Sequence, residues 1–329
     1  MDWRGLNLQK IAKMLLKFKL TKILPVVARV IGESNHFRGR TRIFTAFTDQ
    51  LKLAPGYVKH HTGFSWKIDS LHAQQMFLYS CEPFSSRVLS HFCLNSQFFI
   101  DIGANRGWYS SLLRSQNSNL GIYAFEPDFK IYEILVENLS QFSQINYPIC
   151  TEQIALGRDS GTVSLSTYVD GNDGMMTVFP RTTMKIKSTQ LVRKDSIDGY
   201  FREVMYNFSP GKVLVKIDVE GSEFEVITGG SNFLDIFQPI IVMEINSQLL
   251  TSGGSSSLEI FELMESLEFT SFWLDERGVI SKVRDKTVPP HEKLLGKENG
   301  ANYLFLPKLL YTKLKSGEIG SEDNFKWRF

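Results

Sequence analysis

Residues 101–107 read D-I-G-A-N-R-G and follow the apolar run 98–102. Gly103 permits a tight turn, and Gly107 permits a close approach of the backbone to a ligand. The spacing lacks the third glycine of a dinucleotide fingerprint, and Asp101 would repel a phosphate but suit a cationic ligand. The alternative is a plain strand–helix turn in which Asp101 or Asn105 caps the helix.

Glu126 follows the next apolar run, residues 121–125. A carboxylate at the end of a second strand can accept hydrogen bonds from both hydroxyl groups of a ribose. Together, the loop and Glu126 predict a nucleoside ligand that carries positive charge and no phosphate. S-adenosyl-L-methionine has these features.

Three further acids, Asp218, Glu220 and Glu244, follow or end the apolar runs 213–217 and 240–244. Alternation along an extended chain places Asp218 and Glu220 on one side, where either could remove the proton of a hydroxyl group. The pair could instead hold a cation that orients a diol, or Asp218 could hold the amino group of the cofactor. Glu244 is a candidate contact for an acceptor sugar, and a buried Lys216 would be a charge partner of these acids.

The elements that must position these residues alternate between short apolar runs and helical patterns from residue 97 onward. This order is typical of an α/β fold with a doubly wound, mostly parallel sheet, in which ligands bind at the carboxyl ends of the strands. Residues 160–200 interrupt the alternation with two β-like stretches and predict a β-hairpin insertion. A Gly171–Gly174 turn in this insertion suits a flap over the acceptor.

The segments D-I-G-A-N-x-G-x-Y-S (101–110), F-E-P (125–127) and K-I-D-V-E-G-x-E (216–223) resemble the FkbM-type family of class I methyltransferases. The resemblance covers residues 97–250 and implies a Rossmann-like fold and S-adenosyl-L-methionine as the methyl donor. It implies that Asp101, Gly103, Asn105 and Gly107 bind the methionine part of the donor and that Glu126 binds its ribose. It also implies that Ala155 lies beside the adenine, and that the acceptor is a hydroxyl group of a sugar, a glycan or a related natural product.

The composition and the missing motifs disfavour several kinds of site and several classes of protein. The three cysteines include no C-x-x-C pair and the histidines no H-E-x-x-H motif, so we expect no disulfide scaffold and no structural zinc site, and we assign no residue as a metal ligand. A nicotinamide-dependent oxidoreductase of similar fold and a catalytically silent interaction domain remain alternatives. A nucleic-acid substrate is disfavoured, because residues 31–329 are acidic overall and no N-P-P-Y or D-P-P-Y motif occurs.

The first 30 residues contain seven basic residues and one acidic residue, with Ile11, Met14, Leu15 and Phe18 at helical spacing. This pattern predicts either a helix packed on the body, which we favour, or a basic helix on the inner surface of a membrane. We expect residues 1–95 to form an N-terminal helical extension and residues 96–329 the methyltransferase domain. The absence of a long apolar run and the cysteine content favour a cytoplasmic protein, whose number of subunits these motifs do not specify.

Overall fold

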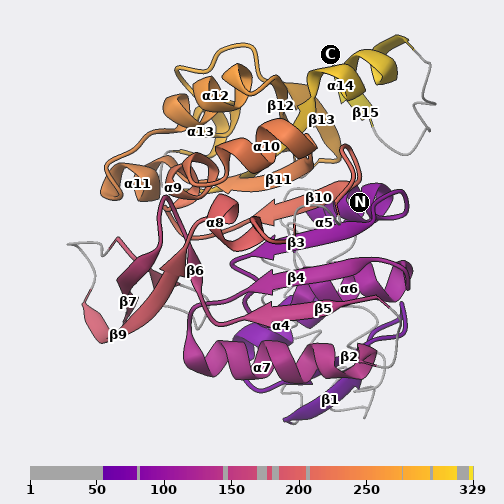
Figure 1. Ribbon diagram of the computed structural model, residues 1–329, viewed down its shortest axis with the longest axis vertical. Coiled ribbons are helices and arrows are strands. Elements are labelled where there is room, and N and C mark those ends of the chain that lie inside the picture. Colours follow the sequence, from indigo (N-terminus) through magenta and orange to yellow (C-terminus); the bar gives the residue numbers. More distant parts are fainter. Residues whose placement is uncertain are drawn as a thin grey trace, which may run out of the picture.

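The computed structural model describes residues 55–79, 82–143, 147–168, 176–179, 185–204, 208–275, 277–296, 299–316 and 326–328. The main sheet contains β3 (Phe98–Ile102), β4 (Gly121–Phe125), β5 (Ile149–Glu152), β10 (Val213–Ile217), β11 (Ile240–Ile245), β12 (Phe269–Asp275), β13 (Val279–Lys282), β14 (Ala301–Pro307) and β15 (Lys326–Arg328). Its order is β15-β13-β12-β14-β11-β10-β3-β4-β5 (Figure 1). The five strands from β5 to β11 are parallel, whereas β14 runs antiparallel to both of its neighbours. The predicted α/β fold with a mostly parallel, doubly wound sheet is confirmed.

Helices cover both faces of this sheet. One face carries α5 (Pro83–Cys93), α6 (Trp108–Gln116), α7 (Phe129–Leu139) and α14 (Lys308–Ser316). The other face carries α8 (Ile197–Phe201), α9 (Glu223–Thr228), α10 (Ser231–Phe237) and α12 (Ser257–Ser266). Two shorter helices, α11 (Ser247–Ser252) and α13 (Pro290–Leu295), connect later elements. We call the first face the α6 face, after one of the helices that cover it.

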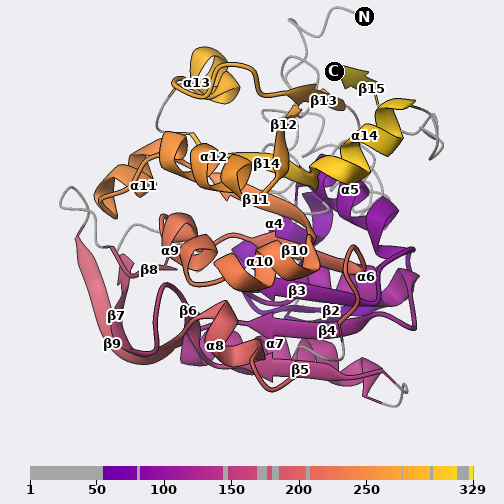
Figure 2. The same ribbon diagram turned by 45° about the horizontal axis from the view of Figure 1, so that its top comes forward.

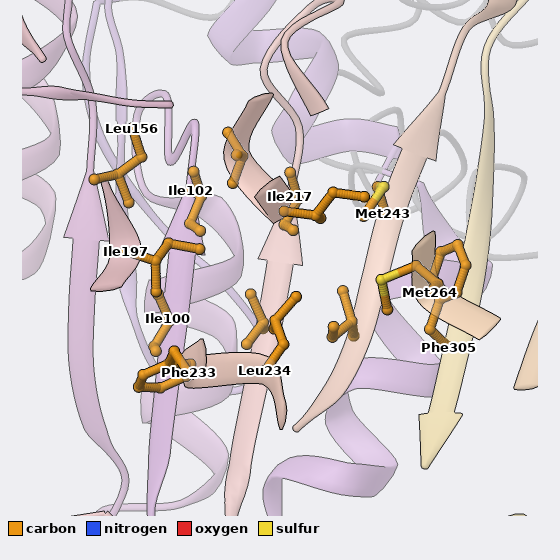
Figure 3. Packing of buried hydrophobic residues seen from close by; sticks show 14 of the residues in the cluster. Ile100, Ile102, Leu156, Ile197, Ile217, Phe233, Leu234, Met243, Met264 and Phe305 are labelled. Atoms are coloured by element: carbon orange, nitrogen blue, oxygen red, sulfur yellow. The ribbon is translucent and has the colours of Figure 1, made fainter. Parts of the chain in front are cut away.

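Alternation within each strand decides which side chains enter which layer. Ile100, Ile102 and Ile217 pack on the side of α10, where Phe233 and Leu234 meet them (Figure 3). Their neighbours Asp101 and Lys216 must therefore point to the α6 face, although both are almost fully buried. The polar residues of these strands are thus placed by the same pattern that builds the core.

The insertion between β5 and β10 forms a second sheet. β7 (Gly161–Tyr168) and β9 (Ile186–Asp195) pair antiparallel, which confirms the predicted hairpin, and β6 (Ala155–Leu156) and β8 (Met176–Thr177) flank them. The hairpin projects on the side toward which the arrowheads of β3 and β4 point (Figures 1 and 2). After β5, Ala155 and Leu156 leave the main sheet and pair with β9. The Gly171–Gly174 turn lies outside the described residues.

The described part of the N-terminal extension combines a hairpin with helices. β1 (Gly56–Lys59) pairs with β2 (Ser65–Ile68), and α4 (Leu71–Tyr79) and α5 follow. Phe64 and Trp66 are fully buried against Trp108 of α6, so this extension shares a hydrophobic core with the sheet. The division at residue 95 stays a prediction, and the basic helix predicted in residues 1–30 lies outside the described residues. In the described part of the chain, no helix has the length and apolar character needed to cross a bilayer.

Candidate active site

A pocket of about 280 Å³ lies at the carboxyl ends of β3, β4 and β10. Its walls include six of the residues that the sequence predicted: Gly103, Asn105, Glu126, Ala155, Asp218 and Glu220. Two further predicted residues lie behind the wall. Asp101 is buried on the α6 face, and Gly107 caps α6 against Leu135 of α7. Their role in cofactor binding stays a prediction.

Glu126 occupies the end of β4 with both carboxylate oxygens fixed by backbone amides. Oε2 accepts a hydrogen bond from the amide of Asn105 at 2.9 Å, and Oε1 accepts one from the amide of Asp128 at 2.8 Å. Each carboxylate oxygen can accept a second hydrogen bond, so the group can still receive two hydroxyl donors from the pocket. Burial raises the pKa of Glu126 to about 7, partly opposed by these amide hydrogen bonds.

The loop after β3 needs its glycine for a contact with the strand beside it. Gly103 has a φ of 78°, and a Cβ atom there would lie 1.9 Å from the carbonyl oxygen of Asp218. Asn105 adopts a left-handed backbone with a φ of 49°, which aims its amide at Glu126. The loop therefore ties the ends of β3, β4 and β10 together.

The N-terminal extension clamps this loop from outside. The guanidinium of Arg106, only 1% exposed, donates to both carboxylate oxygens of Asp69 at 3.0 and 3.1 Å. Asn138 of α7 donates to the carbonyl of Arg106 at 2.8 Å. A paired arginine with planar geometry fixes orientation more strictly than a lysine would. The extension thus contributes to the shape of the loop although it lies outside the motif.

The insertion supplies an apolar wall to the same pocket. Val163, Leu165, Met176 and Val178 line it, together with Ala155 from β6. Apolar side chains in a pocket that also contains the carboxylate predicted to bind a ribose suit an aromatic base. The insertion therefore lines the pocket expected to hold the cofactor. Its predicted position over the acceptor stays a prediction.

The α6 face carries a buried ion pair at the carboxyl edge of the sheet. Lys216 Nζ lies 3.0 Å from Asp218 Oδ2, and its side chain is 1% exposed, which confirms the predicted charge partner. Burial acts to lower the pKa of Lys216, but the charges of Asp218, Glu82 and Glu244 outweigh burial and raise it.

Asp101 is the register partner of Lys216 on β3 and accepts a hydrogen bond from Ser110 at 2.6 Å. Burial raises the pKa of Asp101 to about 6, against the opposing effects of Ser110 and Lys216. Asp101 therefore holds the start of α6 and the lysine in place behind the pocket.

Two more carboxylates join Asp218 on this face. Glu244 ends β11, and Glu82 comes from the extension, where it precedes α5 and accepts a hydrogen bond from Tyr109. Carboxylate oxygens of Glu82, Asp218 and Glu244 lie within 4.8 Å of one another. The charge of Asp218, followed by burial, raises the pKa of Glu244 well above its usual value. We call these three residues the carboxylate cluster.

Glu220 has a strained backbone that the insertion holds. Its φ is 55°, a left-handed value that a non-glycine residue rarely adopts. The hydroxyl of Thr177, from β8, donates to the carbonyl of Glu220 at 2.8 Å and accepts from the amide of Phe179 at 3.1 Å. Strained residues persist only where surrounding contacts impose them. The contact therefore ties the insertion to the candidate catalytic residue.

The sequence did not predict the roles of Glu82, Asn302, Asp69 or Thr177. Asn302 is the register partner of Glu244 on β14, and its only signal is a polar side chain at the start of an apolar run. The other three belong to the extension or the insertion, outside every motif. The structure alone brings them to the site.

The order of strands and the antiparallel β14, with a pocket at the carboxyl ends of β3 and β4, define a Rossmann-like methyltransferase fold. Residues 101–271 match the family model described as the methyltransferase FkbM domain. This match covers more than half of the chain, so the protein belongs to the FkbM family of methyltransferases.

Relatives of this chain are methyltransferases by name. Methyltransferase sdnD of Sordaria araneosa is 28% identical over 159 residues, covering 41% of this chain and 61% of the relative. Hexuronic acid methyltransferase AglP of Haloferax volcanii is 25% identical over 180 residues, covering 54% of this chain and 64% of the relative. This chain therefore spans less than two thirds of the length of either relative.

Among solved structures, methyltransferase FkbM from Methylobacillus flagellatus is similar, with 12% identity and a TM-score of 0.39. The similarity covers 85% of this chain and 57% of the other chain.

Proposed function

We propose that the protein transfers a methyl group from S-adenosyl-L-methionine to a hydroxyl group of a sugar, a glycan or a related natural product. The observation that carries this proposal is Glu126, a buried carboxylate held by two backbone amides at the end of β4. The apolar residues that the insertion adds to the pocket fit a base. The arginine and the lysine that line the pocket, Arg158 and Lys194, pair with Glu225 and Asp159 and come from outside the loop after β3. The donor therefore fits better than a nicotinamide dinucleotide.

The chemistry requires alignment and removal of one proton. S-adenosyl-L-methionine supplies an electrophilic methyl group, whose bond to sulfur breaks as the bond to the acceptor oxygen forms. The acceptor oxygen loses its proton to a base, for which Glu220 is the candidate. Asp218, held by Lys216, lines the pocket and belongs to the carboxylate cluster, so it is the candidate that positions the acceptor. Accurate placement of the two reactants lowers the barrier further.

A polyhydroxylated acceptor fits the α6 face. Carboxylates accept hydrogen bonds from hydroxyl groups, and Lys216 and Asn302 offer donors beside them. The relative from Haloferax volcanii is named as a methyltransferase of hexuronic acid, which is a sugar with several hydroxyl groups. We infer an acceptor of this chemical class.

Two measurements test the proposal. Calorimetry should show binding of S-adenosylhomocysteine by the wild type and no comparable binding of NADH. Incubation with S-adenosyl-L-methionine labelled in the methyl group should then transfer label to a fraction containing sugars. Preference for NADH would support the oxidoreductase alternative, and binding of neither ligand would leave a fold used for interaction.

A further inference from the structure

The carboxylate cluster is assembled from three separate parts of the chain. Glu82 precedes α5, Asp218 follows β10 and Glu244 ends β11. One oxygen from each lies within 4.8 Å of the other two. Oxygen ligands that share a divalent cation at about 2.1–2.5 Å are at most about 5 Å apart. The separations therefore suit one shared ion.

The charges around the cluster also match a divalent cation. Three carboxylates and the ammonium of Lys216 sum to two negative charges when all are ionised. Lys216 contacts Oδ2 of Asp218, and Tyr109 donates to Oε2 of Glu82. The second carboxylate oxygen of Asp218 and that of Glu82 take no part in these two contacts. Like charges at this separation repel strongly unless a cation or a proton lies between them.

Asn302 adds an observation that is independent of the acids. Its side chain is 6% exposed, and its Oδ1 atom has no hydrogen-bond partner among the described residues. Because Asn302 and Glu244 are direct partners in an antiparallel pair, their side chains lie on the same face of the sheet. A buried acceptor without a partner destabilises the folded state. A metal ion would satisfy an oxygen in this position.

We propose that Glu82, Asp218 and Glu244, together with the carboxamide oxygen of Asn302, bind one hard divalent cation such as Mg²⁺ or Mn²⁺. Carboxylate and carboxamide oxygens are the ligands that such ions prefer. The sequence raised a cation only as an alternative role of Asp218 with Glu220. The other proposed ligands come from separate segments with no recognisable spacing.

The role of the ion rests on the proposed function. Mg²⁺ keeps several ligand positions for water or substrate when proteins bind it. Two neighbouring hydroxyl groups of a sugar would fill such positions, and a bound cation makes a hydroxyl group more acidic. Glu220 would then accept the proton from a hydroxyl group that the cation already orients.

Titration of the metal-free full-length chain with Mn²⁺, followed by electron paramagnetic resonance, tests the site without donor or acceptor. The wild type should bind one Mn²⁺ ion, and excess Mg²⁺ should displace it. Glu82→Gln and Glu244→Gln should each weaken binding by about tenfold or more, since affinity follows the charge of the ligands. Asn302→Ala should weaken it less. Glu133→Gln, an exposed acid of α7, is the matched control and should bind as the wild type does.

Failure of the site and failure of the proposed function give different results. Wild-type chain that binds S-adenosylhomocysteine but no Mn²⁺ at about 1 mM, the weak end of protein sites, overturns the cation site alone. Equal Mn²⁺ binding by the wild type and a Glu82→Gln/Glu244→Gln double variant also overturns it. A wild-type chain that binds Mn²⁺ but does not bind S-adenosylhomocysteine instead overturns the proposed function. The first of these outcomes is measured on the wild-type chain, so the cation site can be overturned even if the variants fail to fold.

Discussion

The two halves of the site are built in different ways. Glu126 is held by one short stretch of chain, in which the loop 101–107 and the end of β4 contact each other through hydrogen bonds of the backbone. The carboxylate cluster draws Glu82, Asp218 and Glu244 from segments more than 130 residues apart at its extremes. The first half therefore depends on local backbone geometry, and the second depends on how distant elements pack.

The surroundings of Glu126 and the carboxylate cluster should respond differently to substitutions. A backbone-held carboxylate can serve the same ligand in any chain that keeps the loop. A cluster assembled from the extension and the ends of β10 and β11 can change its chemistry without disturbing that loop. We therefore expect substitutions in the two halves to separate effects on donor binding from effects on acceptor use.

We expect the largest effect from Glu220→Gln, which should lower kcat. The amide keeps the shape of the side chain but cannot accept the proton, so kcat should fall by about 100-fold or more. The affinity for S-adenosylhomocysteine, measured by calorimetry, should stay within a few fold of the wild type. Unchanged kcat would remove Glu220 as the base and leave positioning as the source of rate.

Glu126→Ala should act on the other half. It removes charge-assisted hydrogen bonds to the ribose, together worth about 1.5–3 kcal/mol, so the dissociation constant of S-adenosylhomocysteine should rise by about 10- to 100-fold. kcat at saturating donor should change little. Calorimetry and steady-state kinetics measure the two quantities, and Glu133→Gln on the adjacent helix is the control. An equal loss of both would show that the halves are not separable.

Donor affinity should also depend on pH through Glu126. Its pKa is raised to about 7 by burial, while Asp128 adds a raising charge and Arg106 a lowering one. Only the ionised carboxylate accepts hydrogen bonds from two ribose hydroxyl groups, so lowering the pH through 7 should weaken binding. The dissociation constant should be about tenfold higher at pH 6 than at pH 8. Glu126→Gln should remove most of this dependence, and a wild-type profile that is flat would contradict the assignment.

We expect the smallest effect from a substitution of Thr177, which tests the contact between the insertion and Glu220. Thr177→Val keeps the volume but removes the hydrogen bond to the carbonyl of Glu220, worth about 0.5–1.5 kcal/mol. If this contact positions Glu220, kcat should fall by about 3- to 10-fold with little change in KM for the donor. Thr177→Ser restores the hydroxyl and should recover kcat. A rise in KM alone would show instead that the insertion acts only on the donor pocket.

The sequence by itself determined the central fold and the position of several residues that line the pocket. Strand and helix periodicity located β3, β4, β10 and β11, because a buried parallel sheet requires apolar runs of this length. Gly103, Asn105 and Glu126 could be placed at the pocket because their positions depend on local backbone geometry, which neighbouring residues specify. Asp218 and Glu220 could be named, with Lys216 as a charge partner, but the contact of Thr177 with Glu220 could not.

Only the tertiary structure decided the rest. The contacts of Glu82, Asp69 and Thr177 with the site arise from packing between segments that share no local pattern. Ala155 and Leu156 likewise pair with β9, because the insertion offers them a strand partner outside the main sheet. Asn302 reaches Glu244 through the antiparallel register of β14, which depends on long-range strand pairing. Local sequence specifies local geometry, whereas the carboxylate cluster exists only once distant strands and helices have packed.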